Sequence, residues 1–171
     1  GRGVALLEFG SEVVTVRKKR WKMIAAAILA AISVAVVYWW MEAPPPELHL
    51  QPGDPVLVAQ GAQIYMRECA SCHGRNLEGQ PDWRTRRSDG LLPAPPHDGT
   101  GHTWHHPDGL LIRLTKEGPA AIVNGDYQSA MPGYGGVLSD SEIVAVLSFI
   151  KSTWPDEIRQ RHDLINRRQD Q

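Results

Sequence analysis

The chain has 171 residues, which allows one modest domain with short extensions. Its net charge of −1 conceals an uneven distribution, because residues 1–43 hold six basic and three acidic residues whereas residues 44–171 hold 12 and 16. A small basic head before a mildly acidic body argues against nucleic-acid binding, which requires an extended basic surface.

The first predicted element is an apolar segment near the N-terminus. The residues from Met23 to Met41 include no charged side chain, and a helix of that length, at about 1.5 Å per residue, just spans a hydrocarbon core of about 30 Å. The run of four basic residues before it predicts a cytoplasmic N-terminus. We therefore expect a cytoplasmic segment at residues 1–20 and an uncleaved transmembrane anchor at residues 21–43. A cleaved signal peptide is the alternative, and the aromatic end of the apolar run disfavours it.

A proline-rich stretch follows at residues 44–54 and predicts a semi-rigid spacer that spans at most about 34 Å, at about 3.1 Å per residue. Asp54 and Pro55 then have the pattern of a helix start, with an aspartate cap and a proline in the first turn. Gly61 is costly inside this helix, so we expect it to permit the close approach of another helix. Residues 55–171 form the predicted main domain.

Three further helices are expected in this domain. They are a helix from Pro107 to Gly118, one that opens with the capping box Ser139-Asp140-Ser141-Glu142 and ends near Trp154, and a short polar one from Asp156 to about Arg168. The stretch between residues 74 and 106 is rich in glycine and proline and predicts a long loop. The domain is therefore expected to be all-α.

Residues 69–73 read Cys-Ala-Ser-Cys-His, the C-x-x-C-H pattern of a covalently attached haem. Two thiols about one helical turn apart can add to the two vinyl groups of one haem, and the adjacent histidine then reaches the iron. Both cysteines of the chain lie in this motif, so none remains for a disulfide or a zinc site. We predict one haem c attached at Cys69 and Cys72, with His73 as an axial ligand of the iron.

Five features occur in a fixed order. They are a helix that runs into Cys69-Ala70-Ser71-Cys72-His73-Gly74, a loop with Leu92-Pro93-Ala94-Pro95-Pro96, a middle helix, the sequence Met131-Pro132-Gly133-Tyr134, and a final helix led by Leu138-Ser139-Asp140. In this order they resemble a bacterial class I monohaem cytochrome c over about residues 55–154. The resemblance implies three to five helices around a covalent haem, here with one N-terminal transmembrane helix.

The second axial ligand follows by elimination among the four methionines. Two lie in the predicted anchor, and Met66 lies one turn before the haem motif on the same helix, where it cannot reach the opposite face of the haem. Met131 remains, so we predict that His73 and Met131 bind the iron. The alternative role for Met131 is to fill a gap in the core. A closed iron site favours electron transfer over oxygen or peroxide chemistry.

The resemblance also implies a set of residues around the haem. In the family, a proline carbonyl on the loop after the haem motif accepts the Nδ1–H of the proximal histidine, and Pro93 and Pro95 are both candidates. Trp104, Tyr127 and Tyr134 are candidates to pack on the haem ring or to bond to a propionate. Ordinary core packing is the alternative for each of these three aromatic residues.

Four histidines and an aspartate fall within ten residues, at His97, Asp98, His102, His105 and His106. One interpretation is a second metal site, for copper or zinc, and another is a histidine that replaces Met131 in some state. The simpler interpretation is a polar loop in which His106 caps the following helix and the others bond to loop carbonyls. Adjacent histidines at a helix start point in different directions, which favours the loop.

Together these features predict an electron-transfer protein rather than an enzyme. It would be anchored in the bacterial inner membrane with its haem domain in the periplasm, where haem attachment takes place. By resemblance, its partners are a quinol:cytochrome c oxidoreductase and a terminal oxidase or a photosynthetic reaction centre. The short spacer keeps open a fixed cytochrome subunit of a larger membrane oxidase or dehydrogenase complex. A haem sensor or a copper-handling protein, built on the histidine-rich loop, is a third possibility.

Overall fold

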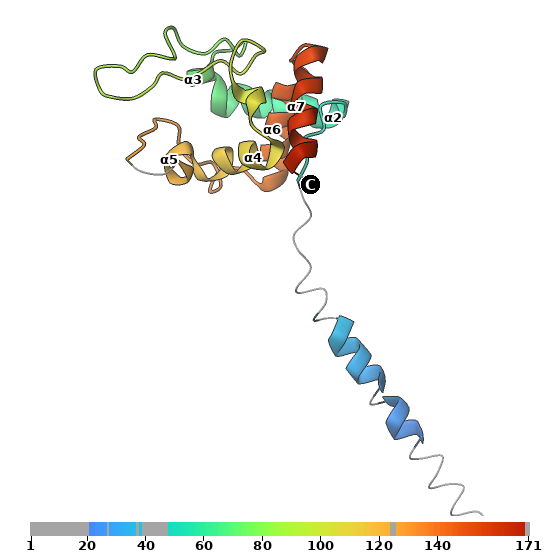
Figure 1. Ribbon diagram of the computed structural model, residues 1–171. Coiled ribbons are helices and arrows are strands. Elements are labelled where there is room, and N and C mark those ends of the chain that lie inside the picture. Colours follow the sequence, from blue (N-terminus) through green and yellow to red (C-terminus); the bar gives the residue numbers. More distant parts are fainter. Residues whose placement is uncertain (1–20, 27, 37, 39–47, 124–125, 170–171) are drawn as a thin grey trace, which may run out of the picture. The chain divides into compact units, whose positions relative to one another are not determined.

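The structure is a computed structural model, and it describes residues 21–26, 28–36, 38, 48–123 and 126–169 (Figure 1). The chain divides into two compact units, Gly1–Pro46 and Glu47–Gln171. Every regular element in the described ranges is helical, and no strand occurs in them. The all-α prediction is confirmed for this part of the chain.

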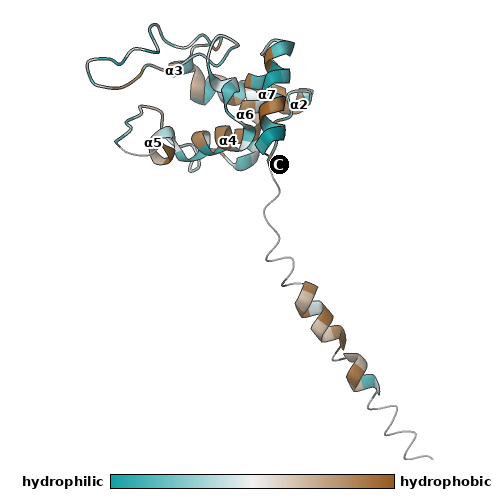
Figure 2. Cartoon of the chain, in the orientation of Figure 1, coloured by the Kyte–Doolittle hydropathy of each residue, from teal (hydrophilic) through white to brown (hydrophobic). Residues whose placement is uncertain are grey.

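The described residues of the first unit are helical and largely apolar. They are residues 21–26, 28–36 and 38, and Figure 2 colours many of these residues as hydrophobic. None of the helices in the described ranges combines the length and the hydropathy that a membrane span requires. The predicted segment at residues 1–20 and part of the predicted anchor lie outside the described residues, so the anchor stays a prediction.

The second unit contains the elements that carry the predicted site. In chain order they are α2 (Pro55–Ile64), a π-helical turn η1 (Tyr65–Cys69), α3 (Ala70–His73), a 3₁₀ turn η2 (Thr103–His105), α4 (Asp108–Glu117), α5 (Pro119–Ile122), α6 (Asp140–Ser152) and α7 (Asp156–Gln169). The predicted caps are confirmed. The carboxylate of Asp54 accepts the first free N–H groups of α2, and Ser139 and Glu142 form a reciprocal capping box at α6.

Helices α2 and α6 pack together in the core (Figure 1), and the backbone at Gly61 lies directly against α6. A Cβ atom on Gly61 would lie 2.6 Å from the carbonyl carbon of Ala145 and 2.9 Å from Cβ of Phe149. Even alanine would therefore collide with the backbone of α6, which confirms the role predicted for Gly61. Because α2 continues into the haem motif, this crossing sets the position of that motif on the core.

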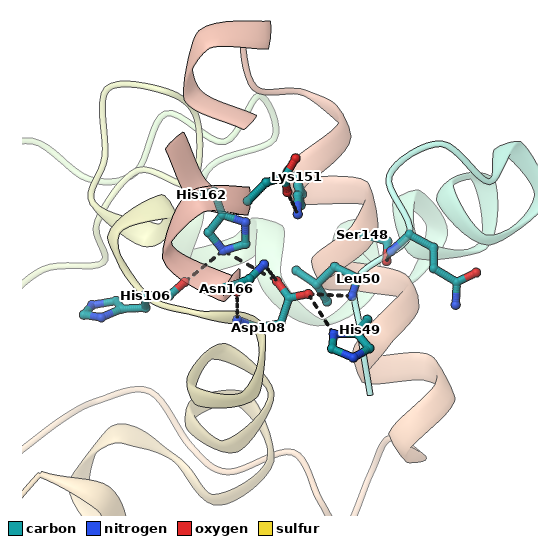
Figure 3. Close-up of polar contacts among 10 residues, drawn as sticks. His49, Leu50, His106, Asp108, Ser148, Lys151, His162 and Asn166 are labelled. Atoms are coloured by element: carbon teal, nitrogen blue, oxygen red, sulfur yellow. Dashed lines mark hydrogen bonds and ion pairs between the residues drawn. The ribbon is translucent and has the colours of Figure 1, made fainter. Parts of the chain in front are cut away.

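The start of the domain differs from the prediction, because residues 48–54 belong to it rather than to a spacer. Leu50 is buried in the core, and its N–H donates to Oδ2 of Asp108 at 2.9 Å (Figure 3). The N–H of Gln51 donates to Oγ of Ser148, also at 2.9 Å. These bonds pin the segment before α2 to both α4 and α6. The sequence pattern missed them because both partners lie far along the chain.

The last helix, α7, packs over the loop that leads into α4. His162 is completely buried and donates its Nε2–H to the carbonyl of His106 at 2.9 Å (Figure 3). The amide oxygen of Asn166 accepts the N–H of Asp108 at 2.9 Å. A residue of α7 thus accepts a hydrogen bond from a free N–H group in the first turn of α4. No side chain from the loop before α4 caps this helix. The expectation that His106 caps α4 was wrong.

Candidate haem site

The two cysteines lie where a π-helical turn passes into α3. The N–H of Ala70 donates to the carbonyl of Tyr65, five residues earlier, which sets Cys69 at the end of the wider turn. Cys69 is half-buried and Cys72 is exposed. Before a haem is attached, burial and the nearby carboxylate of Glu68 raise the pKa of the Cys69 thiol to about 11.

His73 is buried, and its ring is held at one nitrogen. Its Nδ1 lies 2.8 Å from the carbonyl oxygen of Pro95. A carbonyl can only accept, so Nδ1 carries the proton and Nε2 keeps a free lone pair for a metal. Burial lowers the pKa of His73, and the bond to Pro95 partly opposes this. Of the two prolines predicted as candidates, Pro93 and Pro95, the structure gives this contact to Pro95.

The side chain of Tyr65 contacts the C-terminal end of the haem motif. Its hydroxyl donates to the carbonyl of Gly74 at 2.9 Å and lies 3.3 Å from the carbonyl of His73. The side chain is completely buried, and burial raises the pKa of Tyr65, so the hydroxyl remains a donor. The sequence analysis did not indicate Tyr65, which belongs to η1, as part of the site. The periodicity of the helix could place it on the buried face, but it carried no signal for these bonds.

The segment with Met131 docks on the C-terminal end of α4. The N–H groups of Tyr134 and Gly135 donate to the carbonyls of Thr115 and Lys116, each at 2.9 Å. The hydroxyl of Tyr134 donates to the carbonyl of Glu68 at 2.9 Å, next to the first cysteine. Tyr134 thus contacts the residue just before the haem motif, and its role at the haem itself stays a prediction. Met131, three residues earlier in this segment, is half-buried.

The comparisons with known proteins identify the family of the chain. A family model for cytochrome c matches residues 58–154, which is more than half of the chain. The chain belongs to the cytochrome c family. A similar protein is cytochrome c6 of Picosynechococcus sp., which is 30% identical over 92 residues, covering 54% of this chain and 69% of the relative. No solved structure matches the chain. Membership implies one covalently attached haem c, and Cys69 and Cys72 occupy the attachment positions.

An unpaired donor in this cytochrome fits a bound haem. The indole Nε1 of Trp104 is buried and has no hydrogen-bond partner among the described residues. Such a group costs free energy unless a bound molecule supplies an acceptor, and the two propionates of haem are acceptors. The side chain of Trp104 also packs against the apolar core, and its ring stacks on His105 with centroids 3.6 Å apart. Trp104 thus remains a candidate contact of a propionate.

Tyr127 has a different environment from Trp104 and Tyr134. The guanidinium of Arg86 lies over its ring, 5.9 Å from the centroid, which is within the range of a cation–π contact. Arg86 belongs to the loop after the haem motif, so this contact joins that loop to the segment before Met131. A contact of Tyr127 with the haem itself remains a prediction.

Within the predicted cluster, the rings of His102 and His106 meet edge to face with centroids 5.5 Å apart, and the other ring contacts are to aromatic or histidine rings outside the cluster. His97 stacks on His73, His102 stacks on Trp83, and His105 stacks on Trp104. The residues that the structure describes include no group of three or more His, Cys, Asp or Glu side chains suited to hold a metal ion. The geometry therefore gives no support to a copper or zinc site in this stretch.

Proposed function

We propose that the chain is a membrane-anchored monohaem cytochrome that transfers single electrons on the periplasmic side of the bacterial inner membrane. The proposed electron transfer rests on the tautomer of His73. This tautomer leaves the Nε2 lone pair free to bind iron, beside two cysteines at the spacing of haem attachment. The haem, when bound, supplies an iron that exchanges one electron without bond making. The protein holds the ligands in place and so limits reorganisation.

The residues of the predicted haem site have separate roles in this proposal. Cys69 and Cys72 hold the haem covalently, His73 binds the iron, and the carbonyl of Pro95 keeps the imidazole in the required tautomer. Met131 is the proposed second ligand, which closes the iron to oxygen and peroxide and raises the reduction potential.

The anchor is proposed from the sequence of the first unit. Its apolar run follows a group of basic residues, and several of its described side chains are more than half exposed, namely Met23, Ile24, Ile28, Leu29, Ile32, Val34 and Val36. Apolar side chains in such a run are stabilised by an apolar surrounding such as a bilayer. The proposed partners are a quinol:cytochrome c oxidoreductase as donor and a terminal oxidase or a photosynthetic reaction centre as acceptor.

One observation favours the second candidate, a fixed cytochrome subunit of a membrane oxidase or dehydrogenase complex. Residues 48–54 are part of the domain, so only residues 44–47 of the spacer predicted at residues 44–54, which lie outside the described residues, can still serve as a tether. At about 3.1 Å per residue its reach falls from about 34 Å to about 12 Å. A haem domain on so short a tether has little room to move between two large complexes.

A haem-stained native gel of mildly solubilised source membranes separates the two candidates. A haem band that runs alone, near the size of one chain, supports a tethered carrier with transient partners. A haem band within a large complex supports the fixed subunit, and its companion proteins would name the reaction. If the chain is recovered in the soluble fraction, or carries no haem, the proposal is wrong.

A further inference from the structure

His97 lies against the flat face of the proximal histidine. The ring centroids of His73 and His97 are 3.9 Å apart and the ring planes meet at 25°, so the two imidazoles are stacked. The carbonyl of Pro95, two residues before His97, holds the Nδ1 edge of the same ring at 2.8 Å. One segment of three residues thus touches the His73 ring at both its edge and its face.

The backbone of this segment is held firmly. Pro95 and Pro96 restrict φ at two successive residues. The N–H of His97 donates to the carbonyl of Leu77 at 2.8 Å, and its carbonyl accepts the indole N–H of Trp154, also at 2.8 Å. Trp154 is buried just after α6, so the position of His97 is tied to the helical core.

The ring of His97 is also fixed. Its Nδ1 lies 2.9 Å from the hydroxyl oxygen of Thr103, and its edge meets the ring of Tyr65 at a centroid distance of 6.3 Å and an angle of 74°. Rotation of the His97 ring would break the bond to Thr103 and disturb both ring contacts. The surface that His97 presents to His73 is therefore rigid.

A metal-bound imidazole can still rotate about its bond to the iron. A hydrogen bond at Nδ1 tolerates a range of angles. A flat ring on the face of the imidazole resists the same rotation, because turning would drive one edge of His73 into it. We propose that His97 is a positioning residue that sets the rotation of the proximal imidazole about the iron bond, and that Trp154 anchors His97. This inference rests on the proposed haem ligation by His73.

The stacking also assigns His97 to one side of the haem. A ring that lies on the face of the proximal imidazole is on the proximal side of the porphyrin. His97 therefore cannot take the place of Met131 without leaving its stack on His73 and its bond to Thr103. The idea that one histidine of the loop replaces Met131 does not apply to His97 in this arrangement.

The test compares holoprotein variants by EPR of the oxidised haem and by the ¹H NMR shifts of the four haem methyl groups, which both respond to the orientation of the axial imidazole. We expect His97→Leu to shift the g values and to change the spread of the methyl resonances at unchanged haem content. His97→Phe retains a flat ring and should stay near the wild-type spectra. His102→Leu is the matched control in the same loop, because His102 stacks on Trp83, and it should shift neither spectrum.

Wild-type spectra for His97→Leu, or an equal shift for His97→Phe and His97→Leu, would overturn the proposal. If His97→Leu does not fold, Trp154→Phe decides, because it keeps an aromatic ring in the core and removes the donor to His97. A shift of the methyl resonances in Trp154→Phe supports the proposal, and its absence overturns it. A wild-type protein without haem would instead overturn the proposed function, so the two failures are distinguishable.

Discussion

The two sides of the predicted haem site are built in different ways. On the proximal side the side chain of His73 is itself held, by the carbonyl of Pro95 and by the ring of His97. On the other side Met131 is half-buried, and its position depends on backbone bonds made by Tyr134 and Gly135 to α4. The first predicted ligand, His73, is restrained at its reactive group, and the second, Met131, is restrained through its chain. We therefore expect the Met131 side to open first when the protein is perturbed.

The largest effect is expected from Met131→Ala. Loss of the thioether opens the sixth position of the iron, so the ferrous protein should bind CO. The reduction potential should fall by on the order of 0.1 V or more, since axial ligands set it over a range of roughly 0.8 V. Met66→Ala is the control, because Met66 is 41% exposed and precedes the motif. A CO-resistant Met131→Ala protein with wild-type potential would rule out Met131 as the ligand.

A bulkier residue at position 133 should also open the Met131 side of the predicted haem site, by displacing the segment that carries Met131. A Cβ atom on Gly133 would lie 2.7 Å from the carbonyl carbon of Glu117 and 2.9 Å from the carbonyl oxygen of Lys116. Gly133→Ala should therefore lift the segment from α4, with a loss of about 1–3 kcal/mol in the free energy of unfolding and faster CO binding. Gly136→Ala, at a position with no atom within 4 Å of its Cβ, should change neither. Slow CO binding in Gly133→Ala would mean that the docking on α4 does not hold Met131.

The variant Trp104→Phe tests whether the unpaired indole bonds to the haem. Its expected effect on the free energy of unfolding differs between the haem-free and the haem-bound protein. Without haem, removal of a buried donor that has no partner should leave the free energy of unfolding unchanged or raise it. With haem, loss of a bond to a propionate should lower it by about 1–3 kcal/mol. Denaturant titration of both forms gives the two values, with Trp83→Phe as the control. Equal effects in both forms would show that Trp104 does not bond to the haem.

The smallest effect is expected for His162 and appears only as the pH falls. Burial, reinforced by Lys151, lowers the pKa of His162 below its ordinary value, against the opposing charges of Asp108 and Asp163. The unfolded chain then binds more protons than the folded one, so the free energy of unfolding falls as the pH drops below about 6.5. His162→Gln keeps a donor for the carbonyl of His106 and should flatten this dependence in thermal unfolding scans. An unchanged pH dependence would show that His162 does not contribute to it.

Much of the local structure could be predicted from the sequence. A glycine inside a helical pattern indicated the close approach at Gly61, although its partner Ala145 lies far along the chain. The caps at Asp54 and Ser139 and the haem motif each depend on residues close together in the chain. Such signals are strong because one helix turn or one pair of thiols contains the whole pattern. Local signals could not decide between Pro93 and Pro95 as the partner of His73. The two prolines differ only in where the path of the loop places their carbonyls relative to His73.

By itself the sequence determined the haem attachment, the family and the order of the helices, because short motifs and helix periodicity encode them. Only the tertiary structure decided that Leu50 bonds to Asp108, that α7 covers the start of α4, and that His97 stacks on His73. Residues 50 and 108 are 58 positions apart, and His162 lies 56 positions from the carbonyl it binds. Contacts of that kind follow from the packing of whole helices around a shared core, and no local pattern in the chain records them.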